Sequence, residues 1–295
     1  MRANLVIANP TSGQGRGSRV LAETLEFLDF LEAKYKVIAT DSLAQSLAEL
    51  NRNDLADFER LLVIGGDGMM HHVVNAVATS SVFPGIPLGL IPAGTGNDFA
   101  RALGMDLKRP VKNIERFFAL NPITVDIGVV NGRRFGAICS TGFDSLVNER
   151  ANRMSWPKGK RKYDLAMIQE LPRFRPRTYL IEVDGKSFET RAMLIAVANG
   201  SSYGGGMKVC PDANIRDGIL DVMILHPVPK GEFLRIFPKV YSGTHISHPQ
   251  VEIIRGKTIR IMGDAITYAD GERISPTPVE IGVDHEALKT WVNHG

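Results

Sequence analysis

The residues of this chain that could carry chemistry gather in two glycine-rich stretches. In residues 61–77, LLVIGGDGMMHHVVNAV, three glycines surround Asp67. In residues 93–98, AGTGND, the hydroxyl of Thr95 stands between two glycines. Glycine lets a backbone approach a ligand closely, and the N–H groups at a helix N-terminus bind phosphate. The two stretches therefore predict a phosphate site, with Asp67 placed to hold Mg²⁺ directly or through water.

Parallel strands followed by helices must position these stretches. Residues 61–64 predict a buried strand, and a helical spacing of apolar residues follows it: Met69, Met70, Val73, Val74 and Val77. Residues 4–8, 35–39 and 86–92 predict further strands, with helices near 18–31 and from residue 99. Such alternation predicts a parallel α/β sheet, in which ligands bind at the carboxyl ends of the strands.

The pattern changes after Asn121-Pro122. Residues 123–130 and 133–140 predict strands joined by Asn131-Gly132, and residues 179–183 and 188–198 repeat this design around Asp184-Gly185. Further strands are predicted at 219–225, 251–255 and 258–262 and near Tyr268 and Val279, with helices near 142–152 and 232–241.

We therefore predict an α/β plus β protein, in which a parallel α/β domain (1–122) precedes an antiparallel β domain (123–285). Residues 286–295 could pack back on the first domain.

The composition is typical of a soluble protein, with 44% hydrophobic and 23% charged residues. No apolar run approaches the roughly 20 residues that span a bilayer, and the first apolar run is short for a signal peptide. Cys139 and Cys210 do not have metal-site spacing. We expect a reduced, cytoplasmic protein.

One segment of the chain is strongly basic. Residues 150–177 hold nine basic and two acidic residues, a charge of +7, while the whole chain carries +3. An anionic membrane surface or nucleic acid would each suit this segment. A solvated face with no partner would account for it equally well.

Several kinds of enzyme are excluded by their missing motifs. The chain lacks the P-loop, the protein-kinase set, H-E-x-x-H and G-x-S-x-G, and its G-x-G-x-G (13–17) is not the dinucleotide fingerprint. Two phosphate loops with acidic residues nearby suit phosphoryl transfer, which depends on positioning and on charge neutralisation by Mg²⁺. An alcohol acceptor also needs a base.

The ordered motifs of the chain resemble the diacylglycerol and sphingosine kinase family of lipid kinases, in its bacterial soluble form. They span nearly the whole sequence: NPTSGQG, GGDGMMHHVVNAV, PAGTGNDFAR, VDIG, STGFDSLV, YGGGMKVCPDANIRDGILDV and ADGE. The resemblance implies an ATP-binding α/β domain and a lipid-binding β-sandwich, with the active site in the cleft between them. It also implies ATP, Mg²⁺ and a membrane lipid hydroxyl as acceptor.

The resemblance also implies roles for individual residues. Thr40 would flank the nucleotide, and its phosphates would be bound by Asn9, Gly65, Gly66, Asp67, Gly68, Met69, Gly94, Thr95, Gly96 and Asn97. Asp67 and Asp126 would organise the catalytic Mg²⁺ through water, and Asp270 or Glu272 would be the base. In PDANIRDG, the carboxylate of Asp217 and the backbone carbonyls of Asn214 and Ile219 would hold a structural metal.

Ordinary structural roles compete with some of these assignments. Asp-Gly is a common turn, which we accept for Asp184 and which composition alone would favour for Asp270. Asn97 and Asp98 also suit helix capping. Asp126 lies on the face of its predicted strand opposite the alternating Ile and Val residues, and that face could be solvent.

We therefore expect a lipid kinase of phospholipid biosynthesis that converts diacylglycerol to phosphatidic acid. Sphingosine or a phosphatidylglycerol-type lipid could instead be the acceptor, because MMHHVVN resembles sphingosine-kinase-like forms whereas PAGTGNDFAR resembles bacterial diacylglycerol kinases. The sphingosine-kinase-like forms carry Glu where this chain has His72. The sequence also allows a kinase for a soluble acceptor or a non-catalytic nucleotide-binding module. We expect peripheral contact with an anionic membrane through residues 150–177 and no nucleic-acid partner. A homodimer is allowed, because the sequence does not fix the oligomeric state.

Overall fold

The computed structural model describes residues 2–40, 42–78, 85–157 and 159–293. The chain forms two compact units, residues 1–125 with 286–295 and residues 126–285. It passes from one unit to the other within strands β5 (Ile123–Val130) and β16 (Val279–Thr290). No helix among the described residues is long and apolar enough to cross a membrane.

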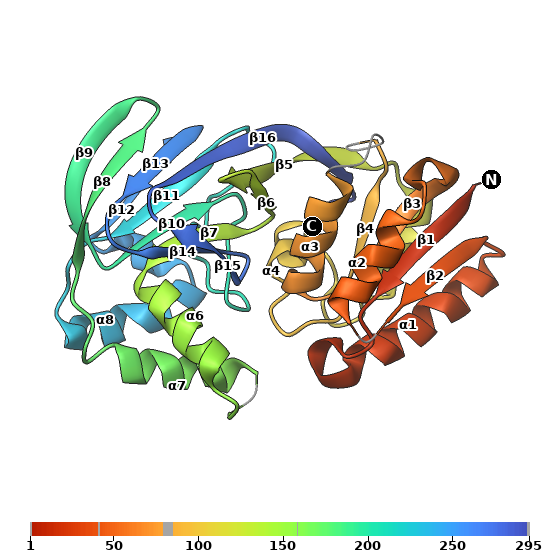
Figure 1. The fold of residues 1–295 in the computed structure, drawn as a ribbon, viewed down its shortest axis with the longest axis horizontal. Coiled ribbons are helices and arrows are strands. Elements are labelled where there is room, and N and C mark those ends of the chain that lie inside the picture. The colour runs from red at the N-terminus through yellow and green to blue at the C-terminus, as the bar shows by residue number, and fades with distance from the viewer. Residues whose placement is uncertain (1, 41, 79–84, 158, 294–295) are drawn as a thin grey trace. The chain divides into compact units, whose positions relative to one another are not determined.

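The first unit is built on a parallel sheet (Figure 1). Its strand order is β2 (Tyr35–Ala39), β1 (Ala3–Ala8), β3 (Phe58–Gly65) and β4 (Leu88–Pro92), and every pair is parallel. The end of β16 adds Thr290 beside Leu88. Residues 61–64 of β3 are fully enclosed, as their uninterrupted apolar run predicts. The predicted parallel sheet is confirmed.

Helices follow these strands. They are α1 (Ser12–Phe30), α2 (Leu43–Asn51), α3 (Asp67–Val77), α4 (Asp98–Ala102) and α5 (Lys112–Ala119), with a 3₁₀ turn at Leu55–Asp57. Helix α3 buries the apolar stripe that its spacing predicts. Gly13–Gly15 have left-handed φ values, so the regular part of α1 begins after them.

The C-terminal segment belongs to this first unit. The indole N–H of Trp291 donates to the carbonyl of Leu120, and its ring lies 4.8 Å from that of Phe117. Further along, the N–H of Asn293 donates to the carbonyl of Leu103. The last strand therefore ends on the helices that follow β4.

The second unit holds two sheets that share one apolar core. One contains β6 (Arg133–Phe135), β5, β16, β13 (Thr258–Met262), β8 (Arg177–Val183) and β9 (Lys186–Ala192). The other runs β12 (Val251–Gly256), β11 (Leu220–Leu225), β10 (Leu194–Ala198), β7 (Ile138–Gly142), β14 (Ile266–Ala269) and β15 (Glu272–Pro276). Side chains from both sheets, such as Ile181 and Val222, form one buried cluster.

Two predicted strands are each divided in the structure. Residues 133–140 form β6 and β7, and residues 188–198 form β9 and β10, which belong to different sheets. Both sheets face the same core, so the apolar pattern continues while the chain crosses from one to the other. The hairpins at Asn131-Gly132 and Asp184-Gly185 form as predicted.

Three helices cover the other face of the second sheet (Figure 1). They are α6 (Phe143–Arg153), α7 (Lys160–Glu170) and α8 (Lys230–Ile236), and 3₁₀ turns follow at Phe237–Tyr241 and Thr244–Ser247. Phe143, Leu171 and Phe233 pack with residues of β10 and β11 in a second buried cluster.

Candidate active site

Three loops of the first unit meet at the carboxyl ends of β1, β3 and β4. A Cβ atom on Gly13 would lie 2.1 Å from the carbonyl oxygen of Ala93. A Cβ atom on Gly94 would lie 2.4 Å from the Cα atom of Gly66. The loops therefore touch through their backbones, and a side chain at these positions would push them apart.

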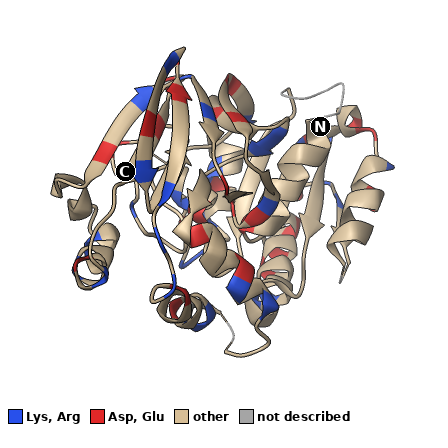
Figure 2. Ribbon diagram, turned by 60° about the vertical axis from the view of Figure 1, so that its left-hand side comes forward, with Lys and Arg blue, Asp and Glu red and all other residues tan. Residues whose placement is uncertain are grey.

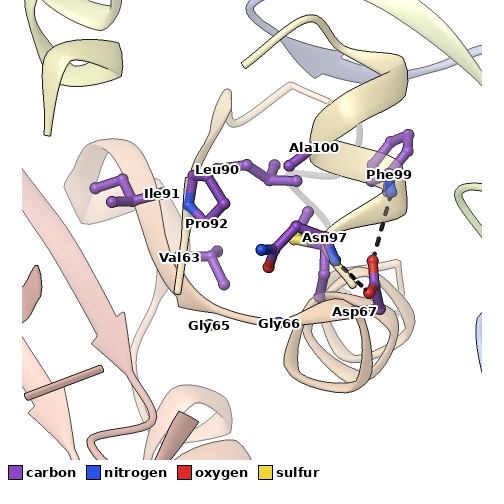
Figure 3. Close-up of a pocket in the computed structure, with 11 residues that line it drawn as sticks. Val63, Gly65, Gly66, Asp67, Leu90, Ile91, Pro92, Asn97, Phe99 and Ala100 are labelled. Atoms are coloured by element: carbon purple, nitrogen blue, oxygen red, sulfur yellow. Dashed lines mark hydrogen bonds between the residues drawn. The ribbon is translucent and has the colours of Figure 1, made fainter. Parts of the chain in front are cut away.

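The Asp67 carboxylate joins the loop after β3 to the loop after β4 (Figure 3). Its Oδ2 accepts the backbone N–H of Asn97 at 2.6 Å, and its Oδ1 accepts that of Asp98 at 2.6 Å. The N–H of Phe99 is a longer third donor at 3.4 Å. Asp67, at the end of the loop after β3, thus caps helix α4. The three N–H donors hold its carboxylate in a fixed position.

Asn97 shapes the loop after β4. Its backbone is left-handed (φ 57°, ψ 42°), and its side chain accepts the N–H of Gly94 at 3.0 Å and donates to the Gly94 carbonyl at 2.8 Å. These bonds close the turn and leave Thr95 exposed at its tip. Asn97 thus has a structural task here, and its contact with a cofactor stays a prediction.

The first loop has a left-handed backbone. Gly13, Gln14 and Gly15 have successive φ values of 58°, 63° and 93°. The N–H of Gly15 donates to the carbonyl of Thr11 at 3.4 Å, so this N–H is used within the loop. The side chain of Asn9 accepts the N–H and the hydroxyl of Thr11, at 3.0 and 2.8 Å, and so holds the start of this loop.

Thr40 lies at the end of β2, close to the first turn of α2. Its hydroxyl is 2.7 Å from the hydroxyl of Ser46 and donates to the carbonyl of Ser42 at 2.7 Å. These hydrogen bonds do not test the predicted contact of Thr40 with the nucleotide, which stays a prediction.

A small cavity lies behind the two glycine loops (Figure 3). Its volume is about 10 Å³, and Val63, Gly66, Asp67, Pro92 and Ala100 are among its lining residues. A space of this size holds roughly one water molecule. The cavity is therefore far too small for a nucleotide.

A second carboxylate, which the sequence pattern identifies only as a helix cap, lies beside Asp67. A Cβ atom on Gly96 would lie 2.4 Å from Asp67 Oδ2 and 3.4 Å from Asp98 Oδ2. The sequence holds a signal for this pair, since both loops read Gly followed within two residues by Asp (GGD, GND). The guanidinium of Arg101 lies 3.7 Å from Asp98 Oδ1 and partly neutralises that carboxylate. Mg²⁺ in phosphoryl-transfer sites takes one or two carboxylates and substrate phosphates, so Asp67 suits the ion better than Asp98 does.

In the second unit, the carboxylate of Asp270 holds the backbone of residues 136–138 in place. Its Oδ2 accepts the N–H of Gly136 at 2.8 Å, and its Oδ1 accepts those of Ala137 and Ile138 at 2.9 and 3.3 Å. Its own N–H donates to the carbonyl of Ile138. The carboxylate therefore fixes the entry to β7, which is a structural task.

Glu272 begins β15 and is half-buried. The pKa of the Tyr163 hydroxyl on α7 is raised, first by burial and then by the negative charge of Glu272. The Glu272 carboxylate therefore lies near Tyr163. The two candidate bases therefore have different surroundings, because Asp270 accepts three backbone N–H groups and Glu272 lies near Tyr163. The identity of the base stays a prediction.

Asp126 is fully buried, so the solvent-facing alternative is wrong. Its Oδ1 accepts the Nδ1–H of His285 at 2.7 Å, and its Oδ2 accepts the N–H of Gly218 at 2.7 Å. A Cβ atom on Gly218 would approach His285 Nδ1 to 3.0 Å. Sequence reasoning does not find His285, because its partner lies 159 residues away and no motif links them.

The predicted structural metal loop contains a cation of its own. The guanidinium of Arg255 pairs with Asp217 Oδ2 and lies 3.5 Å from Asp221 Oδ1, and Asp217 Oδ1 accepts the N–H of Ile219 at 3.1 Å. The side chain of Asn214 accepts the N–H of Arg216. Burial raises the pKa of Asp221, and the charge of Arg255 opposes this shift.

This arrangement is a poor fit for a metal, because Arg255 already neutralises the carboxylate that would bind it. Among the described residues, no group of three or more His, Cys, Asp or Glu side chains is placed to hold an ion. The assignment of Asn214, Asp217 and Ile219 to a metal stays a prediction.

Comparison with known proteins identifies the family. Residues 3–130 match the model described as diacylglycerol kinase catalytic domain, and residues 137–292 match the YegS C-terminal NAD kinase beta sandwich-like domain. A diacylglycerol kinase of Mycobacterium tuberculosis (strain H37Rv) is 38% identical over 238 residues, which cover 78% of this chain and 76% of that protein. The chain belongs to the diacylglycerol kinase family.

Two further diacylglycerol kinases are also similar to this chain. A Bacillus subtilis diacylglycerol kinase is 31% identical over 262 residues, 88% of this chain and 86% of that protein. A diacylglycerol kinase structure from Bacillus anthracis has a TM-score of 0.74 at 19% identity and covers 99% of this chain and 97% of its own. That likeness shows the fold alone. The predicted family and fold class are confirmed, the protein is a lipid kinase, and its family implies ATP as phosphate donor.

Proposed function

We propose that this protein transfers the γ-phosphate of ATP to the free hydroxyl of diacylglycerol, giving phosphatidic acid, and that the reaction needs Mg²⁺. The observation that carries the proposal is the junction of the two glycine loops, held by Asp67 and flanked by Asp98. Backbone donors and paired carboxylates at one point supply what phosphoryl transfer needs, which is positioning and charge neutralisation.

In this proposal the first unit holds the phosphates. Backbone N–H groups of the loop at 65–69 and of Thr95 and Gly96 bind phosphate oxygens, and the glycine-rich turn at 13–15 lies beside them. Asp67, with Asp98 beside it, would hold Mg²⁺, and the bound ion would neutralise the charge of the phosphate oxygens. Asp126, proposed from the family resemblance to act on the same ion, belongs to the second unit and holds His285 and the 214–219 loop there.

Glu272 is the proposed general base. It takes the proton of the acceptor hydroxyl as the oxygen attacks phosphorus. Asp270, two residues earlier, is assigned to building the loop before β7, because its oxygens accept three backbone N–H groups. A positioned base of this kind contributes about 10²–10⁴-fold to the rate.

The acceptor is proposed as diacylglycerol because the relatives that match most of the chain carry that name. His72 lies on α3 beside the buried His71, with ring centroids 5.3 Å apart. It cannot supply a permanent carboxylate, which weighs against the sphingosine alternative. We also propose that the protein docks peripherally on anionic membranes through residues 150–177.

A lipid panel tests the proposal. The protein is incubated with γ-labelled ATP, Mg²⁺ and detergent-dispersed diacylglycerol, phosphatidylglycerol or sphingosine, with NAD as a soluble acceptor. We expect label in phosphatidic acid at a rate well above the other acceptors. Label chiefly in another lipid would show that this lipid, and not diacylglycerol, is the acceptor. ATP binding with no labelled product would favour a non-catalytic module.

A further inference from the structure

An aromatic side chain stands exposed on the connection between α6 and α7. Trp156 is 75% exposed, and Ile168, on α7, is 60% exposed. We propose that this connection anchors the protein to lipid, with Trp156 inserted into the interfacial layer of an anionic bilayer and nearby cations on the lipid headgroups. The inference rests on the proposed function, since it specifies how the kinase reaches a membrane-bound acceptor.

An indole of this exposure has an energetic reason to bind an apolar phase. Trp carries one of the largest apolar surfaces of any side chain and a polar N–H, so it partitions to membrane–water interfaces. The rest of α7 is well supported, because Ala166 is fully buried and Leu171 lies in the core cluster with Phe143. Trp156 and Ile168 therefore project from a helix pair that the core holds in place.

The charges around Trp156 are the second observation. Three arginines of residues 150–177 have acidic neighbours within the unit: Arg150 pairs with Glu170, Arg177 lies 3.3 Å from Asp264, and Arg153 lies 3.3 Å from Glu149, which Arg273 shares. Their charges are offset at least in part by these neighbours. The basic character of the segment therefore depends on its other cations.

Four described cations of the segment form no ion pair within 4.0 Å with any described residue: Arg161, Lys162, Arg173 and Arg175. They lie on α7 and in the turn after it. Figure 2 shows all described Lys and Arg residues in blue. Lys158 and the side chain of Lys160 lie outside the described part of the chain. Each cation near an anionic leaflet strengthens binding about fivefold.

An anionic bilayer fits this surface better than nucleic acid does. The four cations could serve the phosphates of either partner. An exposed aliphatic side chain such as Ile168 gains nothing from a polyanion, whereas a bilayer interface accepts both Ile168 and the indole. Helix α7 has 11 residues, so it would lie along the surface and not cross it.

Tryptophan fluorescence tests the inference directly. Of the two tryptophans, Trp156 is exposed and Trp291 is 4% exposed, so changes in acrylamide quenching report on Trp156. The full chain is mixed, without ATP, with vesicles of phosphatidylcholine alone or with phosphatidylglycerol. We expect a blue shift and protection from quenching with the anionic vesicles. Unchanged emission and quenching would overturn the inference.

Variants give a quantitative test by vesicle sedimentation. Trp156→Ala should weaken binding to anionic vesicles about tenfold, and Trp156→Phe by less. Phe30→Ala, at an 80% exposed aromatic of α1, is the matched control and should change nothing. The double variant Arg161→Glu, Arg175→Glu should weaken binding at least about tenfold. Equal binding by Trp156→Ala and Phe30→Ala would overturn the anchor.

Two further measurements separate this inference from the proposed function. Turnover of diacylglycerol in detergent micelles does not require a bilayer, so Trp156→Ala should keep it. Insertion of Trp156 without turnover of any lipid would support the anchor and contradict the proposed function. Turnover of diacylglycerol in micelles without insertion of Trp156 into vesicles would support the proposed function and contradict the anchor. A response of Trp156 to RNA and not to vesicles would also overturn the anchor.

Discussion

At the scale of single residues, carboxylates of this protein hold backbone segments in place in addition to their proposed catalytic roles. Asp67 and Asp270 each accept three backbone N–H groups from another segment of the chain. An ionised carboxylate is a strong acceptor for such donors and fixes loop geometry. Substitutions at these positions therefore change stability and activity together, and the two effects must be measured separately.

Asp67→Asn should reduce turnover at least about 100-fold, because the variant keeps an acceptor oxygen for α4 but loses the charge that binds Mg²⁺. Its free energy of unfolding should fall by about 1 kcal/mol. Steady-state kinetics and urea unfolding check the two effects. Turnover close to that of the parent would remove Asp67 from the proposed metal site.

Glu272→Gln and Asp270→Asn should behave differently. The first should lower kcat by about 10²–10⁴-fold with little change in stability. The second should lower the free energy of unfolding by about 1–3 kcal/mol, because an amide cannot accept the N–H groups of Gly136, Ala137 and Ile138 equally well. If Asp270→Asn alone lost turnover while keeping its stability, the roles would be exchanged.

Asp144, at the first turn of α6, makes stability depend on pH. Burial raises the pKa of its carboxyl from 3.8 to about 6, against a smaller lowering by Ser140 and Ser145. Between these values the folded protein keeps a proton that the unfolded chain has released. The contribution of Asp144 to stability therefore falls as pH rises through this window and is constant above it.

Asp144→Asn removes the cost of burying this charge. At a pH of about 8 the variant should be more stable than the parent by as much as ~3 kcal/mol, and at a pH of about 4 the two should be similar. Urea unfolding at both pH values measures the difference. A gain of equal size at both would show that burial of the charge is not its cause.

At the level of residues, the sequence predicts the glycine loops and their acids but not their bonds. Asp67 is foreseeable, because a strand-to-helix turn rich in glycine has no need of a carboxylate. The contact of Asp126 with His285 is not foreseeable from the sequence. It joins β5 to β16, which are 159 residues apart at this contact. Long-range hydrogen bonds of this kind leave no local pattern.

At the scale of elements, the glycine junction is the part least tolerant of change. Gly96→Ala would place a Cβ atom 2.4 Å from Asp67 Oδ2, so it should weaken ATP binding and lower stability by about 1–3 kcal/mol. Gly231→Ala on α8, where a Cβ atom would meet nothing within 4 Å, is the matched control and should raise stability slightly. Calorimetry with ATP and thermal unfolding compare the two.

Equal behaviour of the two alanine variants would show that the loop at Gly96 does not depend on close contact with Asp67.

Most elements follow from local pattern, and the exceptions have physical reasons. The hairpins at Asn131-Gly132 and Asp184-Gly185 are fixed by their turns. Helix α7 is not predictable from the sequence, because KRKYDLAMIQE has little amphipathic character and its helix is supported by packing on α6. Tertiary packing of this kind overrides a weak local signal.

At the scale of the whole molecule, each unit follows from its own pattern of periodicity. Strand–helix alternation gives the parallel sheet of residues 1–125, and hairpins give the antiparallel sheets of residues 126–285. The sequence cannot show that β5 and β16 both join the two units, because the pairing of distant strands is set by the core that they share.

The central claim is the transfer of phosphate from ATP to a lipid hydroxyl, and the most direct test follows the phosphate itself. The protein is supplied with γ-labelled ATP, Mg²⁺ and diacylglycerol, and the organic extract is analysed for labelled phosphatidic acid. The account predicts stoichiometric transfer of label, at least about 100-fold slower with Glu272→Gln. Consumption of ATP without labelled lipid, or transfer at an equal rate by Glu272→Gln, would contradict it.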